Sequence, residues 1–197
     1  MDKPSPIHQH HHAVQFYEND SSLFTTVAGF LSQGLVEEHP AIIIATAEHT
    51  AAILEHLSGR LIDVEKAREL GELVVLDAHQ TLALFMDGDR PDAARFEASV
   101  GRAIGNLLKG RPNRTLIRAY GEMVDVLWRE GREEAAIHLE LLWNGLAGRY
   151  GFALLCGYAM GNFFKQTERY EEVCRHHTHV IPSSDGAAEL PKRDLLN

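Results

Sequence analysis

The sequence predicts an α/β fold, a three-layer sandwich with a mostly parallel central sheet. Apolar runs alternate with helical patterns about five times along the 197 residues. Several of these runs are rich in Val, Ile and Leu without a polar alternation, which is typical of parallel strands covered on both faces. Repeated strand–helix alternation favours right-handed βαβ crossovers, and these place helices on both sides of one sheet.

The first elements show how the assignment is made. Residues 13–17 (AVQFY) form a short apolar strand. A helix follows, in which we expect Ser21 or Ser22 to cap the N-terminus and Gly34 to end the helix. The same criteria, β-branched or apolar runs for strands and a 3.6-residue period for helices, give the remaining elements in order: strand 41–46, helix 48–57, strand 73–78, helix 91–109, strand 115–122, helix 133–150, strand 152–159, helix 166–177 and an edge strand 178–182.

Length and composition indicate one folded domain with loose ends. Hydrophobic residues make up 45% of the chain and charged residues 24%, which is typical of a globular domain that needs no disulfide or metal to fold. Residues 1–12 read as a flexible His-rich arm, residues 13–182 as the domain, and residues 183–197 as a flexible tail.

Net charge, apolar runs and cysteine count argue against nucleic-acid binding, a membrane partner and a secreted disulfide scaffold. The chain carries 19 basic and 28 acidic residues, a formal net charge of -9, so we expect no direct binding of nucleic acid. It has no apolar run of about 20 residues and no charged-then-apolar leader. Two cysteines are too few for a secreted disulfide framework. We therefore expect a cytoplasmic protein without a membrane partner.

The common nucleotide-binding and hydrolytic signatures are absent. No GxxxxGK[ST], GxGxxG, GxSxG or HExxH motif occurs. The turn after the first strand, FYENDSSLF, has neither a glycine nor a lysine, and its Glu18 and Asp20 would repel a triphosphate. These observations exclude a conventional phosphate loop.

Three features remain, and each has a plain structural alternative. Glu122 ends a buried strand and is a candidate polar group in an apolar pocket walled by Trp128 or Trp143. Alternatively, Glu122 caps the next helix and both tryptophans fill the core. Cys156 is either a ligand-sensing thiol or an inert buried side chain.

The third feature is a set of clustered histidines near both ends. The C-terminal set reads C-x-H-H-x-H, and its Cys174, His177 and His179 suit a transition metal. It lacks the paired C-x-x-C spacing, and residues 10–12 can complete a site only if the two ends meet. Solvated imidazoles are the alternative, and we assign no cofactor.

Several phrases together resemble one family, the MEDS domain of methanogen and methylotroph sensory proteins. They are HAVQFYENDSSL (12–23), FLSQGL (30–35), AIIIATAEHTAAILEHL (41–57), AYGEMVDVLW (119–128), LELLWNGL (139–146), FALLCGYAM (152–160) and VCRHHTHVIP (173–182). The resemblance implies a RecA-like fold of the KaiC type, in which FYENDSSLF takes the place of the phosphate loop. Glu48 falls near the catalytic carboxylate of those ATPases, but that role is not carried over without a phosphate cradle.

The resemblance also implies a sensory domain that binds small organic molecules such as hydrocarbon derivatives. Relatives are often fused to histidine kinases, PAS domains or DNA-binding domains. Only fifteen residues follow Pro182, so we expect no output domain of its own. Signalling would then require docking on a partner such as a histidine kinase or transcription regulator, or a change in homo-oligomeric state.

The residues at the strand ends and the resemblance to the MEDS domain together predict a non-catalytic sensor. Its pocket is expected at the carboxyl ends of the strands. Glu122 or Tyr17 would supply the directional hydrogen bond and the aromatic side chains the apolar area. The residues expected to line it are His12, Phe16, Tyr17, Glu122, Trp143 and Cys156. The alternatives are a metal or haem sensor that uses the clustered histidines and Cys174, and a scaffold that binds protein alone. An enzyme would need a convergent pair such as Glu48 with His79, and nothing in the spacing selects one.

Overall fold

The central sheet has six strands, and every neighbouring pair is parallel. The computed structural model describes residues 11–181, and the strand order across the sheet is β3-β2-β6-β7-β1-β8. The strands are β1 His12–Tyr17, β2 Ala41–Ala45, β3 Leu73–Asp77, β6 Arg118–Gly121, β7 Ala153–Ala159 and β8 His179–Ile181, with a separate antiparallel pair of β4 Met86–Asp87 and β5 Arg90–Pro91. Strand β2 is buried throughout and β7 is buried except at its last residue, as their continuous apolar runs predict.

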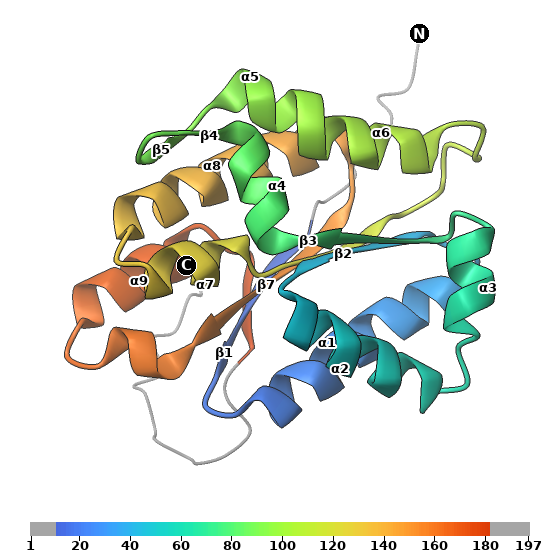
Figure 1. Cartoon of the computed structure of the whole chain (residues 1–197), viewed down its shortest axis with the longest axis horizontal. Helices are drawn as coiled ribbons and strands as arrows, with labels where there is room; N and C mark the ends of the chain where they lie inside the picture. The colour runs from blue at the N-terminus through green and yellow to red at the C-terminus, as the bar shows by residue number, and fades with distance from the viewer. Residues whose placement is uncertain (1–10, 182–197) are drawn as a thin grey trace, which may run out of the picture.

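Helices cover both faces of the sheet, so the predicted three-layer α/β sandwich is confirmed (Figure 1). One layer holds α1 Asp20–Val36, α2 Ala47–Ser58 and α3 Val64–Glu69. The other holds α4 Ala78–Phe85, α5 Ala93–Phe96, the π-helical turn η1 Glu97–Gly101, α6 Arg102–Leu108, α7 Met123–Arg129, α8 Glu133–Tyr150, the 3-10 turn η2 Met160–Phe163 and α9 Thr167–Arg175. Each layer packs its own buried apolar cluster against the sheet.

The ends of helix α1 differ from the expected ones. Asn19, and not Ser21 or Ser22, caps α1, because its side chain accepts a hydrogen bond from the backbone N–H of Ser22. The helix also continues past Gly34 to Val36. A Cβ at Gly34 would lie 2.7 Å from the Cδ atom of Arg118, so a larger residue there would force the Arg118 side chain to move.

Short elements were missed where the local signal is weak. The helices α3 and α4 and the β4–β5 pair were not predicted, and the expected helix 91–109 is divided into α5, η1 and α6. Residues 1–10 of the predicted arm and the whole predicted tail lie outside the described residues. The arm is also shorter than expected, because His12 already belongs to β1 and is fully buried.

The strand connections indicate where in the sheet a ligand site is expected. After β1 and β2 the chain enters the α1–α3 layer, whereas after β6 and β7 it enters the opposite layer (Figure 1). In open α/β sheets, ligands bind at the carboxyl ends of neighbouring strands whose connections diverge in this way. The pairs β2/β6 and β7/β1 both meet this condition. Within residues 11–181, no helix combines the length and the apolar character needed to cross a bilayer.

Candidate functional site

Polar side chains converge at the carboxyl ends of β1, β2 and β6. We name this group the carboxyl-edge network: Tyr17, His49, Tyr120, Glu122, Asp125 and Arg129. Tyr17 and Tyr120 belong to strands, His49 lies in the first turn of α2, and Glu122 connects β6 to α7. Sheet topology therefore brings together residues that are as much as 112 positions apart.

Glu122 joins the end of β6 to the start of α2. Its Oε1 atom accepts the backbone N–H of Thr46 at 2.6 Å, and its Oε2 atom lies 2.6 Å from Nδ1 of His49. The Tyr120 hydroxyl donates to the same Oε2 atom at 3.3 Å. Glu122 occupies the N-cap position of α7, but its side chain makes no capping bond there. The capping alternative is therefore wrong for this side chain, which crosses to the neighbouring strand instead.

Glu122 and His49 shift each other's proton affinity. Burial by itself raises the pKa of Glu122, but the hydrogen bond and charge of His49 and the amide of Thr46 outweigh it, so the pKa lies below its ordinary value. The hydrogen bond to Glu122 raises the pKa of His49 in spite of burial. The pair therefore favours the imidazolium–carboxylate form, in which both partners are charged.

This pair predicts a pH dependence of stability. Folding raises the pKa of His49. Its contribution to the free energy of unfolding is therefore complete below about pH 6.5 and is lost as pH rises through the folded pKa. Because the pKa of Glu122 is lowered, its contribution is present above about pH 4.5 and is lost as pH falls through the folded pKa.

We expect the wild-type free energy of unfolding to fall, relative to that of His49→Gln, as pH rises from about 6 to about 8. Urea denaturation at a series of pH values measures this difference. Glu122→Gln should remove the same pH dependence. A wild-type-minus-variant difference that stays flat over this range would contradict the pairing.

Asp125 forms the second half of the carboxyl-edge network. It is fully buried, and its Oδ1 atom accepts the backbone N–H of Ala159 at 2.9 Å and Nδ2 of Asn162 at 2.7 Å. Its Oδ2 atom accepts the Tyr17 hydroxyl at 3.1 Å and forms an ion pair with Arg129. Burial raises the pKa of Asp125, while the Ala159 amide and Arg129 oppose that rise. Asp125 thus ties α7 to the ends of β1 and β7.

A pocket opens beside this network, beyond the carboxyl ends of β1 and β7. Its volume is about 590 Å³, and its lining residues come from the β1–α1 turn, from the segment that follows β7 and from the first part of α9: Glu18, Met160, Gly161, Phe163, Phe164, Lys165, Thr167 and Tyr170. Asn162 in the same segment donates to Asp125, so the pocket wall and the network are directly connected. Lys165 has a φ of 61°, a left-handed backbone conformation that residues other than glycine rarely adopt.

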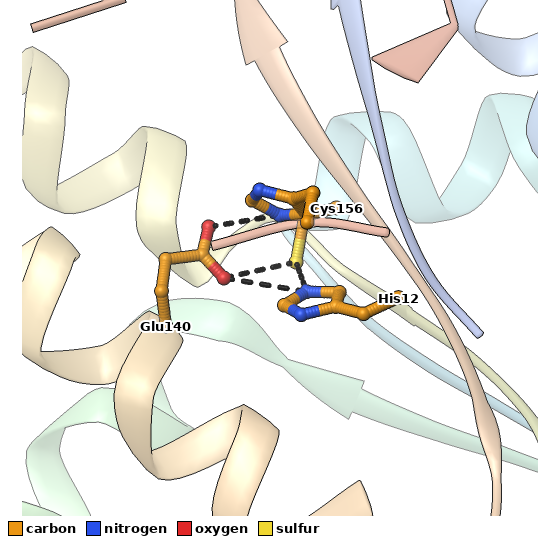
Figure 2. Close-up of side chains that lie close together, drawn as sticks. His12, Glu140 and Cys156 are labelled. Atoms are coloured by element: carbon orange, nitrogen blue, oxygen red, sulfur yellow. Dashed lines mark hydrogen bonds and ion pairs between the residues drawn. The ribbon is translucent and has the colours of Figure 1, made fainter. Parts of the chain in front are cut away.

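A second group of polar side chains lies between the sheet and helix α8. We name it the His-Cys-Glu cluster: His12 of β1, Glu140 of α8, Cys156 of β7 and His177 after α9. One ligand-type atom from each of the four lies within 4.8 Å of those from the other three. Figure 2 shows His12 and Cys156 pointing toward the Glu140 carboxylate.

Burial and mutual contacts together set the protonation of this cluster. Burial raises the pKa of the Cys156 thiol well above its ordinary value, and the Glu140 charge adds to that rise. Burial lowers the pKa of His177 to about 4. Burial by itself raises the pKa of Glu140, but His177, His12 and the Tyr158 hydroxyl outweigh it and lower the value to about 2. At neutral pH the cluster therefore contains a carboxylate, a thiol and a neutral His177.

The structure divides the residues predicted to line one pocket. Tyr17 and Glu122 both belong to the carboxyl-edge network, while His12 and Cys156 meet in the His-Cys-Glu cluster. Phe16 packs behind the wall of the pocket beyond β1 and β7, because its ring centroid lies 4.4 Å from that of Tyr170, which lines the pocket. All six predicted residues are at most 4% exposed. Their role in ligand binding stays a prediction.

Trp128 and Trp143 are both at most 4% exposed, and both pack in the apolar core, as the structural alternative predicts. Of the predicted metal ligands, His177 joins the His-Cys-Glu cluster. Cys174 is half-buried beside Tyr170, and the exposed His179 has its Nδ1 atom 2.9 Å from the hydroxyl oxygen of Thr178. The two described ends do meet, since the backbone N–H of Thr178 donates to the carbonyl of His12 at 2.7 Å.

Sequence reasoning missed several of these residues, although some carried a signal. Asp125 and Arg129 are spaced i and i+4 on one short helix, which is the spacing of a helical ion pair. Glu140 lies three positions before Trp143 on the apolar face of α8, and a buried acid on such a face requires a partner. His49 had no such signal, because its partner Glu122 is 73 positions away.

Comparison with known proteins agrees with the resemblance. No curated protein matches the chain. The family model that matches is that of the MEthanogen/methylotroph, DcmR Sensory domain, and the match covers residues 11–178. This range contains both the carboxyl-edge network and the His-Cys-Glu cluster. The chain therefore belongs to the MEDS family of sensory domains.

Proposed function

We propose that this domain binds a small organic molecule in the pocket beyond β1 and β7 and reports its presence to a signalling partner. The observation that carries this function is the position and lining of the pocket. It lies where the connections of β1 and β7 diverge to opposite layers, which is the usual ligand position in such sheets. Its volume of about 590 Å³ lies within the range of small-molecule sites.

The lining suits a small, mostly apolar ligand. Met160, Phe163 and Tyr170 supply apolar surface, and Glu18 and Lys165 place one charge of each sign at the pocket. The Nζ atom of Lys165 lies 5.1 Å from the centre of the Phe164 ring. A few polar groups on an apolar wall fix the orientation of a ligand while the wall supplies most of the buried area.

A ligand here can act as a signal because the pocket wall is continuous with a helix and an edge strand of the domain. Tyr170 belongs to α9, which leads into the edge strand β8, and Asn162 connects the wall to Asp125. A ligand that favours one position of α9 shifts the equilibrium between two states by its difference in affinity. The partner would then be a histidine kinase or a transcription regulator that contacts the shifted surface, or a second copy of this chain.

We also infer a non-catalytic role. Glu122 has a lowered pKa and accepts from Thr46 and Tyr120 as well as facing His49. Asp125 accepts from four groups. A general base needs a free lone pair within reach of a substrate proton, and both carboxylates are already committed to contacts that hold strands and helices together.

The test uses small hydrocarbon derivatives as probes: methanol, methylamine, dichloromethane and their longer homologues. A binding probe should raise the Tm, and calorimetry should give its Kd. Phe164→Ser should weaken binding about tenfold or more, because it removes apolar wall. Phe164 is 76% exposed, so the change should leave the fold intact.

Leu61→Ser is the matched control, because Leu61 is 95% exposed and lies outside the pocket. This variant should bind the probe like the wild type. Equal affinity in Phe164→Ser and in Leu61→Ser would show that the pocket is placed wrongly. If no probe raises the Tm of the wild type, the sensory ligand does not belong to this class.

A further inference from the structure

The His-Cys-Glu cluster has more hydrogen-bond acceptors than donors. The Nδ1 atom of His177 lies 2.8 Å from the carbonyl oxygen of Val173, which can only accept, so the ring proton is on Nδ1. Its Nε2 atom therefore presents a lone pair to the centre of the cluster. That atom is buried and has no hydrogen-bond partner among the described residues.

The same reasoning fixes the proton of His12. The side-chain Nδ2 of Asn144 donates to the carbonyl oxygen of His176 at 3.0 Å, which fixes the orientation of the amide. The Oδ1 atom of Asn144 then lies 3.0 Å from Nδ1 of His12 and must accept its proton. In the neutral form of its ring, His12 therefore also presents the lone pair of Nε2 to the centre.

The carboxylate of Glu140 adds two more acceptor atoms. Its Oε2 atom lies 3.3 Å from Nε2 of His12, and its Oε1 atom lies 3.4 Å from Nε2 of His177. The Tyr158 hydroxyl donates to Oε1 at 2.8 Å, and the thiol of Cys156 is the other donor. With both rings neutral, the Cys156 thiol supplies one proton for two facing pairs of acceptor atoms, Nε2 of His12 with Oε2 of Glu140 and Nε2 of His177 with Oε1 of Glu140. A cation at the centre satisfies both pairs.

Several distances within the cluster match the edges of a coordination tetrahedron. Metal–ligand bonds of about 2.0–2.3 Å give tetrahedron edges of about 3.3–3.8 Å between ligand atoms. Four contacts in the cluster lie in this range: 3.3 Å from Nε2 of His12 to Sγ of Cys156, 3.3 Å from Nε2 of His12 to Oε2 of Glu140, 3.7 Å from Sγ of Cys156 to Oε2, and 3.4 Å from Nε2 of His177 to Oε1 of Glu140. Glu140 thus faces His12 and Cys156 with one carboxylate oxygen and His177 with the other. Figure 2 shows three of these side chains, from two strands and a helix, around one point.

We propose that His12, Glu140, Cys156 and His177 bind one divalent transition-metal ion, of which Zn²⁺ fits best. Nitrogen, sulfur and oxygen ligands in a tetrahedron are those of zinc sites, and four protein ligands leave no open position for a substrate. The Asn144 and Val173 carbonyl groups are the outer partners that metal-bound histidines require. Binding converts the thiol to a thiolate and releases one proton to solvent.

The ion would connect both ends of the domain to its centre. His12 belongs to the first strand and His177 precedes the last strand, whereas Glu140 and Cys156 lie on a central helix and a central strand. The side chains of His12, His177 and Glu140 are 0% exposed. The metal must therefore enter during folding or by local opening, and its loss should loosen β1 and β8. This site is independent of the proposed pocket.

The experiment uses the full chain without an affinity tag, refolded with Co²⁺ or Zn²⁺. We expect one tightly bound ion per chain and, for Co²⁺, a thiolate-to-metal charge-transfer band. Cys156→Ser should abolish the band and lower the affinity by more than the roughly 10–100-fold cost of losing an outer partner. Cys174→Ser is the matched control and should keep both, because Cys174 lies outside the cluster.

X-ray absorption of the zinc-loaded wild type tests the site even where a variant does not fold. It should show one sulfur ligand at about 2.3 Å and nitrogen or oxygen ligands at about 2.0–2.1 Å. Replacing His8, His10 and His11 by alanine should leave this signal unchanged. Three outcomes would each overturn the site: a ligand shell without sulfur, unchanged metal affinity in Cys156→Ser, or loss of metal binding when those three histidines are replaced.

Discussion

Trp143→Ala should lower the free energy of unfolding by about 3–5 kcal/mol, the usual cost of truncating a large buried aromatic side chain. Trp143 is 0% exposed and lies between two rings, with its centroid 5.3 Å from that of Phe96 and 6.1 Å from that of Phe152. It also packs on the sheet, since a Cβ at Gly121 would lie 3.4 Å from its Cζ2 atom. Close packing on three sides leaves little room for the core to collapse around the cavity.

Trp143→Phe should cost less than half as much as Trp143→Ala. The indole Nε1 atom is buried and has no hydrogen-bond partner among the described residues, so its loss removes no bond. Urea denaturation followed by circular dichroism measures both variants. If Trp143→Ala cost less than about 1 kcal/mol, the side chain would not belong to the core, and its role as a ligand wall would regain support.

Asp125→Ala should lower the free energy of unfolding by about 3 kcal/mol or more, because it leaves several buried donors without an acceptor. The groups affected are the backbone N–H of Ala159, the amide of Asn162 and the hydroxyl of Tyr17. Arg129 loses its ion-pair partner but is 45% exposed, so water can solvate its charge. The cost therefore arises mainly at the ends of β1 and β7.

The matched control is Asp89→Ala, since Asp89 is 95% exposed and its ion pair with Arg132 should contribute no more than about 1 kcal/mol. Chemical denaturation gives the stability of each variant. Amide hydrogen exchange at Ala159 should accelerate in Asp125→Ala and stay slow in Asp89→Ala. Slow exchange at Ala159 in both variants would show that Asp125 does not hold the end of β7.

The accuracy of the predicted elements followed the strength of the local signal. Helix α8 spans residues 133–150, as predicted, because its apolar residues recur over five turns and Gly151 ends it with a φ of 65°. Strand β2 differs from the prediction by one residue, because AIIIA is buried on both faces. The four-residue helix α5 and the two-residue strands β4 and β5 are too short to show a period.

For the site residues, the prediction succeeded only where the property predicted is local in the sequence. The sequence indicated Tyr17 and Glu122 correctly as strand-end residues, because the end of a strand is a local property. It could not indicate that Glu122 would face His49, or that Asp125 would hold Ala159, because those contacts cross between strands. It placed His177 in a local metal set with Cys174 and His179, whereas sheet pairing gives His177 other neighbours.

The sequence alone determined the α/β class, the buried parallel strands and membership of the MEDS family, since each is recorded in local pattern or in the order of phrases. The tertiary structure alone decided which polar groups share a site. His12 and His177 are far apart in the chain, and they meet because β8 pairs with β1 beside β7, which carries Cys156. Strand order is set by long-range packing that no short window of sequence contains. The apolar interior then leaves the few buried polar side chains no partner except one another.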